Sequence, residues 1–413
     1  MGRTRADHRL RWLLSSSAVS NLGDGVGKVA FPLLATTLTH DPVLIAGLSA
    51  VQFLPWLLFA VVAGALVDRV DRRRAMVLAN VARAVVGGSV AVLVAAGTVS
   101  IWLVYVAALL IGTAETVADS AANALIPAVV GEHDLEGANS KLQACEIVGQ
   151  TFLGGPVGST AFALFATFPF LLNSAGFAIA AAVLLGLGGT YRPKPAEPTR
   201  FRSDLADGIR WLRRSPLMLR LLAIAGLLSL LSELAQAQLV LYALDDLKLS
   251  DATFGLFAFV GGIGGLAGAG LAPRLVHRFS RRAVLVGGVL CCAAGFGGMG
   301  LTRQPVTSAL LFGLFAAAMV AVNVVLATVR HTLVPGELLG RVLGVWRTVV
   351  WGVIPVGALL GGLLTEALGS AGRTFTASGV ALLAVTIYAA ASLRRFPIDD
   401  KTASSRPVLP LEQ

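Results

Sequence analysis

Long apolar stretches alternate with short polar loops along the whole chain. Twelve stretches can be marked, each close to or above the about 20 apolar residues that a helix needs to cross a bilayer. They cover residues 12–38, 43–66, 75–97, 101–128, 142–166, 169–190, 217–244, 253–274, 283–301, 306–329, 342–366 and 375–393. The pattern predicts an all-α integral membrane protein with twelve transmembrane helices.

The composition supports this prediction. Apolar residues make up 56% of the chain and charged residues 14%, whereas a soluble domain is about half apolar and about a quarter charged. The first stretch follows four arginines but is too long for a signal peptide, and no small-residue cleavage site closes it. We interpret it as a retained first helix.

The net charge of +10 is distributed in a way that orients the chain. Of the 33 Lys and Arg residues, 28 fall in the loops, termini and span ends on the side of the N-terminus. Lys248, Arg303 and Arg373 fall on the opposite side, and Lys28 and Arg83 lie within spans. The positive-inside rule therefore predicts that both termini are cytoplasmic. The basic loops would rest on anionic lipid, and we expect no nucleic-acid partner.

No catalytic or cofactor-binding pattern is found in the sequence. Cys145, Cys291 and Cys292 fall within predicted spans, without disulfide or metal-ligand spacing. Residues 295–300 match the dinucleotide fingerprint in letters only, because they lie in a span. We therefore expect neither an enzyme nor a bound cofactor or metal. The sequence also lacks a phosphate-binding loop.

A polar segment at residues 191–216 divides the chain into two halves. It holds several prolines and many basic residues, and its basic helix beside Trp211 is typical of the membrane interface. The predicted units are an N-terminal six-helix bundle (1–190), this cytoplasmic linker, a C-terminal six-helix bundle (217–396) and a cytoplasmic tail (397–413).

The two halves also repeat each other weakly. The basic loop after the second span, which ends at Arg74, has a counterpart after the eighth that ends at Arg282. The fourth span ends at Leu125-Ile-Pro127 and the tenth at Leu333-Val-Pro335. Parallel repeats of six helices are one known transporter architecture, with the substrate site between the halves.

The loop after the second span resembles the signature of the major facilitator superfamily. The matching residues are Gly64, Asp68, Arg69, Arg72 and Arg73, while Asp71 stands where the signature has a glycine. The first span reads Ser20-Asn-Leu-Gly-Asp24-Gly25 and then Ala30-Phe-Pro32-Leu. This phrase is similar to a group of bacterial exporters that includes the enterobactin exporter, the Tap-type multidrug pumps and the macrolide efflux proteins.

Two features depart from the antiporters of that superfamily. The fourth span lacks the arginine that many drug–proton antiporters carry there. The fifth has Gly154-Gly-Pro156-Val-Gly158, a shortened version of the antiporter helix motif. The resemblance nevertheless covers essentially the whole chain and implies the major facilitator fold.

Asp24, near the middle of the first span, is the sharpest candidate for chemistry. An ionisable side chain within a span is costly and is by default a functional candidate. A carboxylate that titrates there can take up a proton on one side of the membrane and release it on the other. Lys28 lies one turn further along the same helix face, so a permanent Asp24–Lys28 pair is the structural alternative.

The fourth span places three polar residues on one helix face. Glu115, Asp119 and Asn123 follow one another at intervals of four residues. The resemblance implies that the first, fourth, seventh and tenth helices line the central cavity. Two acids there would favour a cationic substrate or a proton relay. Asp119 and Asn123 lie near the cytoplasmic end, however, where contact with water is the simpler explanation.

Other polar residues within spans complete the candidate set for proton coupling and substrate binding. Two of them are glutamates, Glu146 and Glu233, and either can supply a second protonatable site or bond to a neighbouring helix. Arg83 can neutralise one of the acids within the spans, but the sequence does not indicate which. These further candidates are Asn21 in the first span, Glu146 and Gln150 in the fifth, Glu233 and Gln236 in the seventh, and Asn323 in the tenth.

The signature loop implies a second, conformational site. By resemblance, Asp68 helps to hold the cytoplasmic side closed in the outward-facing state, where a carboxylate can meet helix-terminal N–H groups. Arg69, Arg72 and Arg73 are expected to combine this contact with lipid anchoring. Gly64 completes the motif at the end of the second span.

The sequence therefore predicts a secondary active transporter, with proton-coupled efflux of small amphipathic or hydrophobic molecules by alternating access as the leading hypothesis. An importer or a lipid flippase of the same fold remains an alternative, and so does a non-transporting membrane sensor or scaffold. The bias toward Ala, Gly, Val and Arg suggests a bacterial genome, so we expect a multi-pass monomer in the bacterial inner membrane.

Overall fold

The computed structural model describes residues 2–67, 69–130, 135–192 and 201–394, and every element within these ranges is helical. The tail that the sequence predicts at 397–413 lies outside them. Nine of the described helices are long and apolar enough to cross a membrane. Helices suit this composition, since a helix satisfies its own backbone hydrogen bonds and lipid offers no other partners.

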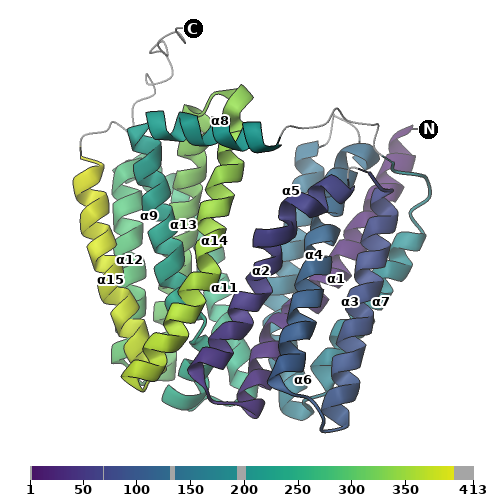
Figure 1. Ribbon diagram of the computed structural model, residues 1–413, viewed down its shortest axis with the longest axis horizontal. Helices are drawn as coiled ribbons and strands as arrows, with labels where there is room; N and C mark the ends of the chain where they lie inside the picture. Colours follow the sequence, from purple (N-terminus) through teal and green to yellow (C-terminus); the bar gives the residue numbers. More distant parts are fainter. Residues whose placement is uncertain (1, 68, 131–134, 193–200, 395–413) are drawn as a thin grey trace.

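The first half of the chain forms one bundle (Figure 1). Within it, α3 packs against both α4 and α7, and α1 packs against α7. The elements are α1 (Gly2–Leu38), α2 (Pro42–Val67), α3 (Arg72–Ala95), α4 (Ile101–Val130), α5 (Leu135–Glu146), η2 (Ile147–Gly154), α6 (Gly155–Leu164) and α7 (Phe168–Leu185).

The second half forms the other bundle, and α8 (Phe201–Arg214) lies across its end in Figure 1. A phenylalanine core packs α12 against α13 and α15: Phe296 stacks on Phe315 with ring centres 3.9 Å apart and meets Phe375 edge-to-face. The elements are α9 (Pro216–Gln236), α10 (Leu239–Leu241), η3 (Tyr242–Asp246), α11 (Asp251–Phe279), α12 (Arg281–Leu301), α13 (Pro305–Leu333), α14 (Gly336–Leu368) and α15 (Ala371–Ser392).

Two stretches that the sequence predicts as single spans are irregular in the structure. The stretch 142–166 contains the π-helical segment η2 between α5 and α6. Pro156 explains it, because proline has no N–H to donate to the carbonyl one turn before it. The helix of the stretch 217–244 is interrupted after α9, at Ala237 and Gln238. There Gln238 Nε2 donates to the carbonyl of Pro42, 3.2 Å away in the first bundle.

The two bundles meet through small residues at one end. Helix α2 packs on α14, and α6 packs on α11. The backbones approach so closely that a Cβ atom on Gly255 would lie 2.5 Å from the carbonyl oxygen of Gly155. A Cβ on Gly362 would lie 2.8 Å from the Cα of Val43. From this end the ribbons diverge toward the end where α1 begins and α15 ends (Figure 1).

Candidate functional site

A buried ion pair joins α1 to α3 inside the first bundle. The Nη1 atom of Arg83 donates to both carboxylate oxygens of Asp24, at 2.9 and 3.0 Å. Its Nη2 atom donates to Asn80 Oδ1 at 2.7 Å, and its guanidinium carbon lies 4.1 Å from the centre of the Phe177 ring. Arg83 is 2% exposed and Asp24 8%. Burial of both charges is tolerated because each is paired and hydrogen-bonded.

The static pair between Asp24 and Lys28, which the sequence left open, does not form. Lys28 is exposed and donates instead to the side chain of Gln150, in η2. Gln150 in turn donates to Asn21 Oδ1 at 2.7 Å. Arg83 is the partner of Asp24 because α3 packs beside α1 at this level, and a planar guanidinium can contact both carboxylate oxygens.

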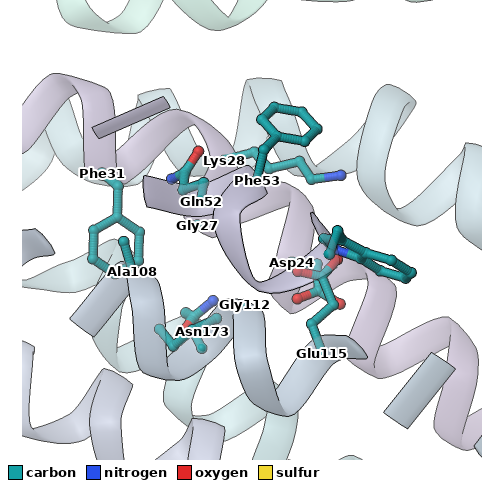
Figure 2. A pocket seen from close by; sticks show the side chains of 12 residues that line it. Asp24, Gly27, Lys28, Phe31, Gln52, Phe53, Ala108, Gly112, Glu115 and Asn173 are labelled. Carbon is teal, nitrogen blue, oxygen red and sulfur yellow. The ribbon is translucent and has the colours of Figure 1, made fainter. Parts of the chain in front are cut away.

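Glu115 lies beside this pair without a partner of its own. Among the residues that the structure describes, its carboxylate has neither a hydrogen bond nor a salt bridge. The charged groups around it are Asp24, Lys28, Asp119 and Arg83. Figure 2 shows the Glu115 side chain turned toward Asp24. Both acids line a cavity of about 120 Å³ whose lining also includes Lys28, Gln52, Trp56 and Asn173.

A second cavity, of about 70 Å³, lies on the other side of the ion pair along α1. Arg83 and Asn80 form part of its lining, with Asp119, Asn123 and Glu146 around them. Water needs only about 10–15 Å³ of such volume, so both cavities can hold several waters. Neither approaches the 300–1,000 Å³ of a site for a drug-sized ligand. The Asp24–Arg83 pair thus separates two small polar cavities.

The predicted stripe on α4 is divided between these cavities. Glu115 lines the first, whereas Asp119 and Asn123 line the second. Asn123 is exposed and its side chain donates to the carbonyl of Asp119 at 3.0 Å. Glu146 is also exposed.

The candidates of the second bundle lie apart from this site. Glu233 and Gln236 are half-buried on α9, and Asn323 is exposed on α13. None of the three lines either cavity. Glu233 faces α14, where a Cβ atom on Gly357 would lie 3.2 Å from the Cβ of Glu233.

The arginines of the signature loop have separate roles. Arg72 donates to the carbonyl of Ala124 at 2.8 Å. Arg73 donates to the carbonyls of Leu184 and Leu185, at 2.8 and 2.6 Å, at the end of α7. Both side chains therefore fasten α3 to its neighbours. Arg69 is exposed. Asp68 and the surroundings of Gly64 lie outside the described residues.

Asp71 makes the turn that a glycine makes in the signature. Its side chain caps α3 by accepting from the N–H of Arg74 at 3.0 Å, and it also accepts from the N–H of Tyr191 at 2.7 Å. Burial raises the pKa of this carboxyl, but the two N–H groups and the charges of Arg74 and Arg73 outweigh that effect and hold its pKa below the usual value.

Sequence reasoning missed two contributors to the site. Asn173, in the middle of α7, donates to the carbonyl of Gly23 at 2.7 Å and lines the first cavity. Trp56 lines that cavity and packs edge-to-face on Trp351 of the second bundle, with ring centres 5.5 Å apart. The guanidinium of Arg347 lies 4.4 Å from the Trp351 ring. A polar asparagine within an apolar span was the available signal for Asn173.

Comparison with known proteins agrees with this architecture. Residues 5–412 match the major facilitator family described as "Transmembrane secretion effector". The chain belongs to this family. It is therefore a membrane transporter of the major facilitator superfamily and not an enzyme. The predicted resemblance to that superfamily, and to the group that includes the Tap-type pumps, is confirmed.

Several relatives match over most of their length. The multidrug efflux pump Tap of Mycolicibacterium fortuitum is 27% identical over 395 residues, which cover 91% of this chain and 94% of that protein. The MFS-type transporter YfiS of Bacillus subtilis is 26% identical over 373 residues, 87% of each chain.

Solved structures show the same fold. The nucleoside transporter NupG superposes with a TM-score of 0.75 over 94% of this chain and 99% of that one, at 12% identity. A bacterial homologue of the iron transporter ferroportin in the inward-facing state gives a TM-score of 0.72 over 94% and 99%, at 19% identity. These likenesses establish the major facilitator fold of the described helices.

Proposed function

We propose that this transporter exports small amphipathic or hydrophobic molecules across the bacterial inner membrane in exchange for protons. It would work as a monomer with twelve spans, in two six-helix bundles with both termini in the cytoplasm. The observation that carries the coupling part of the proposal is Glu115, a carboxylate without a partner among the described residues, beside the Asp24–Arg83 pair. The name of the Tap relatives supports the outward direction.

The coupling would arise because two carboxylates share one guanidinium. In the state described here Arg83 pairs with Asp24, and Lys28 and Asp119 are the other charged groups around Glu115. An ionised Glu115 is a second anion beside Arg83. It would compete with Asp24 for the guanidinium, so uptake or loss of a proton by Glu115 would be linked to the pairing of Asp24 with Arg83. Release of Arg83 from Asp24 would then join the two cavities.

The substrate would lie between the bundles, since neither small cavity can hold it. The Trp56–Trp351 contact joins the polar cavity to the second bundle. A rearrangement of side chains around Glu115 would therefore shift this contact between the bundles. The acids of the first bundle favour a substrate with a positive charge or none. Rocking of the two bundles about their glycine contacts would expose that space to each side in turn.

The test is efflux of a dye and antibiotic panel from pump-deficient cells, with and without a protonophore. We expect wild type to expel at least one cationic or neutral amphipathic compound in a protonophore-sensitive way. Glu115→Gln should abolish that efflux, because a permanently neutral side chain cannot release a proton. Glu366→Gln, on an exposed residue of α14, is the matched control and should behave as wild type.

The same assay separates the parts of the proposal. Undiminished gradient-driven efflux in Glu115→Gln would remove Glu115 as the coupling residue. Undiminished efflux in Asp24→Asn would exclude a coupling role for the ion pair. If wild type accumulates the compounds instead of expelling them, the importer alternative is correct. If it moves none of them, the export proposal is wrong, and a flippase or a non-transporting sensor must be considered.

A further inference from the structure

A groove on the outer surface of the first bundle is not used by the proposed transport cycle. It has a volume of about 640 Å³ and runs between α3 and α4 from the end where α3 begins. It shares no lining residue with either of the two polar cavities inside the bundle. Its lining consists of Arg69, Val70, Asp71, Arg74, Ala75, Leu78, Ala79, Ala82, Leu110, Thr113, Ala114, Val117 and Arg192.

The mouth of this groove is strongly basic. Arg69, Arg74 and Arg192 line it, and all three are exposed. No hydrogen bond or salt bridge joins their side chains to any other residue in the part of the chain that the structure describes. Asp71 is the one acid of the lining, and its carboxylate already accepts from two backbone N–H groups. The mouth therefore offers three cationic side chains to a ligand.

This arrangement differs from that of the neighbouring arginines. Arg72 and Arg73 are directed to backbone carbonyls inside the bundle, where they hold helices together. Arg69, in the loop before α3, and Arg74, in the first turn of α3, are close to Arg72 and Arg73 in sequence but line the groove on the outer surface. The signature loop thus supplies two arginines for packing and two for the groove.

The floor of the groove is apolar and faces the lipid. Leu78 is 68% exposed and Leu110 is 50% exposed, and most of the other lining side chains are alanine or valine. From Arg74 to Ala82 the groove follows α3 for about 12 Å, at about 1.5 Å per residue. One leaflet of the hydrocarbon core is about 15 Å thick. A hydrocarbon chain that starts at the arginines can therefore lie in the groove over most of one leaflet.

We propose that this groove binds one anionic phospholipid. The phosphate is held by Arg69, Arg74 and Arg192, and one acyl chain packs on Leu78, Ala82 and Leu110. A soluble phosphate would satisfy the mouth but not the apolar floor. Guanidinium groups suit the occupant because they bind phosphate oxygens through paired N–H donors. The bound lipid would bridge the start of α3 and the segment after α7 that carries Arg192.

Native mass spectrometry of the delipidated full-length protein tests this proposal. The probes are palmitoyl-oleoyl phosphatidylglycerol and palmitoyl-oleoyl phosphatidylcholine, which have the same chains. We expect wild type to retain one phosphatidylglycerol with at least about tenfold higher affinity than phosphatidylcholine, since each basic residue near a headgroup contributes measurably. This comparison needs no variant. Equal affinity for the two lipids would overturn the proposal.

Two variants then locate the site. The triple variant Arg69→Gln, Arg74→Gln and Arg192→Gln should lose at least about tenfold in affinity for phosphatidylglycerol. Its control, Arg274→Gln, Arg278→Gln and Arg394→Gln, removes three charges from exposed residues of the second half and should bind as wild type. Equal losses in the two triple variants would show general surface attraction and overturn the specific site.

The apolar floor is tested without a change of charge. Ala82→Trp should block the groove and weaken phosphatidylglycerol binding by a similar factor. Leu383→Trp, at a residue of α15 that is 44% exposed, should have no effect. Unchanged binding in Ala82→Trp would contradict the proposed acyl-chain position. Displacement of the lipid by millimolar glycerol phosphate or inorganic phosphate would show that the arginines bind a soluble anion, and the lipid proposal would be wrong.

Discussion

Arg83 contacts both carboxylate oxygens of Asp24 although the two residues are 59 positions apart in the sequence. The pair joins the first helix to the third and forms the boundary between two polar cavities. Arg83 Nε has no hydrogen-bond partner among the described residues. The guanidinium therefore has a free donor with which to meet a second acid without first leaving Asp24.

Removal of one partner of this pair should destabilise the protein strongly. Asp24→Asn or Arg83→Gln leaves an uncompensated buried charge, which typically costs about 3–5 kcal/mol. We expect each single variant to lower the Tm in detergent. The double variant Asp24→Asn and Arg83→Gln should be more stable than either, because neither charge remains. A double variant that loses as much as the sum of the two single losses would show that the pair is not coupled.

Close packing of α1 on η2 should make Gly25 intolerant of even a methyl group. A Cβ atom there would lie 2.7 Å from the Cα of Gln150, so one backbone must move. Overpacking of this kind typically costs about 1–3 kcal/mol, and Gly25→Ala should lower the Tm.

Gly287, on α12, is the control for that substitution, since nothing lies within 4 Å of its Cβ position. Gly287→Ala should leave the Tm unchanged or raise it, because alanine favours the helix by up to about 1 kcal/mol. Equal effects of the two substitutions would contradict the close α1–η2 contact.

Asp71 should make the stability depend on acid. Burial raises the pKa of this carboxyl in the folded state. The N–H donors and arginines outweigh burial and hold the pKa below its ordinary value of 3.8. A depressed folded pKa contributes stability above the unfolded pKa, and this contribution is lost as the pH falls through the folded value. Wild type should therefore melt above Asp71→Asn at pH 7, and the difference should shrink below about pH 4. A difference in Tm that stays constant down to pH 2 would exclude this carboxylate as the cause.

The contact between α6 and α11 should control the relative position of the bundles. A Cβ atom on Gly255 would lie 2.0 Å from Ser159 Oγ and 2.5 Å from the carbonyl of Gly155. Gly255→Val should therefore separate the bundles at this end and impair transport. Gly270 lies on the same helix, and nothing is within 4 Å of its Cβ position. Gly270→Val should therefore change neither the separation of the bundles nor transport.

Spin labels at the exposed residues Phe165 and Leu256 can measure this separation in a cysteine-free background. We expect the mean distance between the labels to increase by several ångströms in Gly255→Val and to stay constant in Gly270→Val. A distance that stays constant in both variants would mean that another contact holds the bundles.

Much of the fold could be predicted from the sequence because the length of apolar stretches and the position of basic loops are local signals. The irregularities in the fifth and seventh predicted spans could not be predicted in this way. There the apolar pattern continues through Ile147–Gly154 and past Ala237, and hydropathy does not distinguish a π-helical turn or a kink from a regular helix. The motif that does mark the first irregularity is the Gly154-Gly-Pro156 sequence.

The sequence indicated which charged residues belong to the site but not which of them form an ion pair. Asp24 and Glu115 stood out as charges within spans, yet Lys28 was the nearest cation in sequence and Arg83 is the partner in space. Only the packing of α3 beside α1 decides between the two cations. The same holds for Asp71, since its second donor, Tyr191, is 120 positions away.

The π-helical segment η2 gives the fifth predicted span a built-in change of winding. A π-helical turn holds more residues than an α-helical turn. If Ile147–Gly154 rewound as an α-helix, α6 would rotate about its own axis relative to α5. That rotation would turn Gly155 and Ser159 away from Gly255 and Ala252, where Ser159 now donates a hydrogen bond. Torsion within one helix can therefore release the contact between α6 and α11 without breaking that helix.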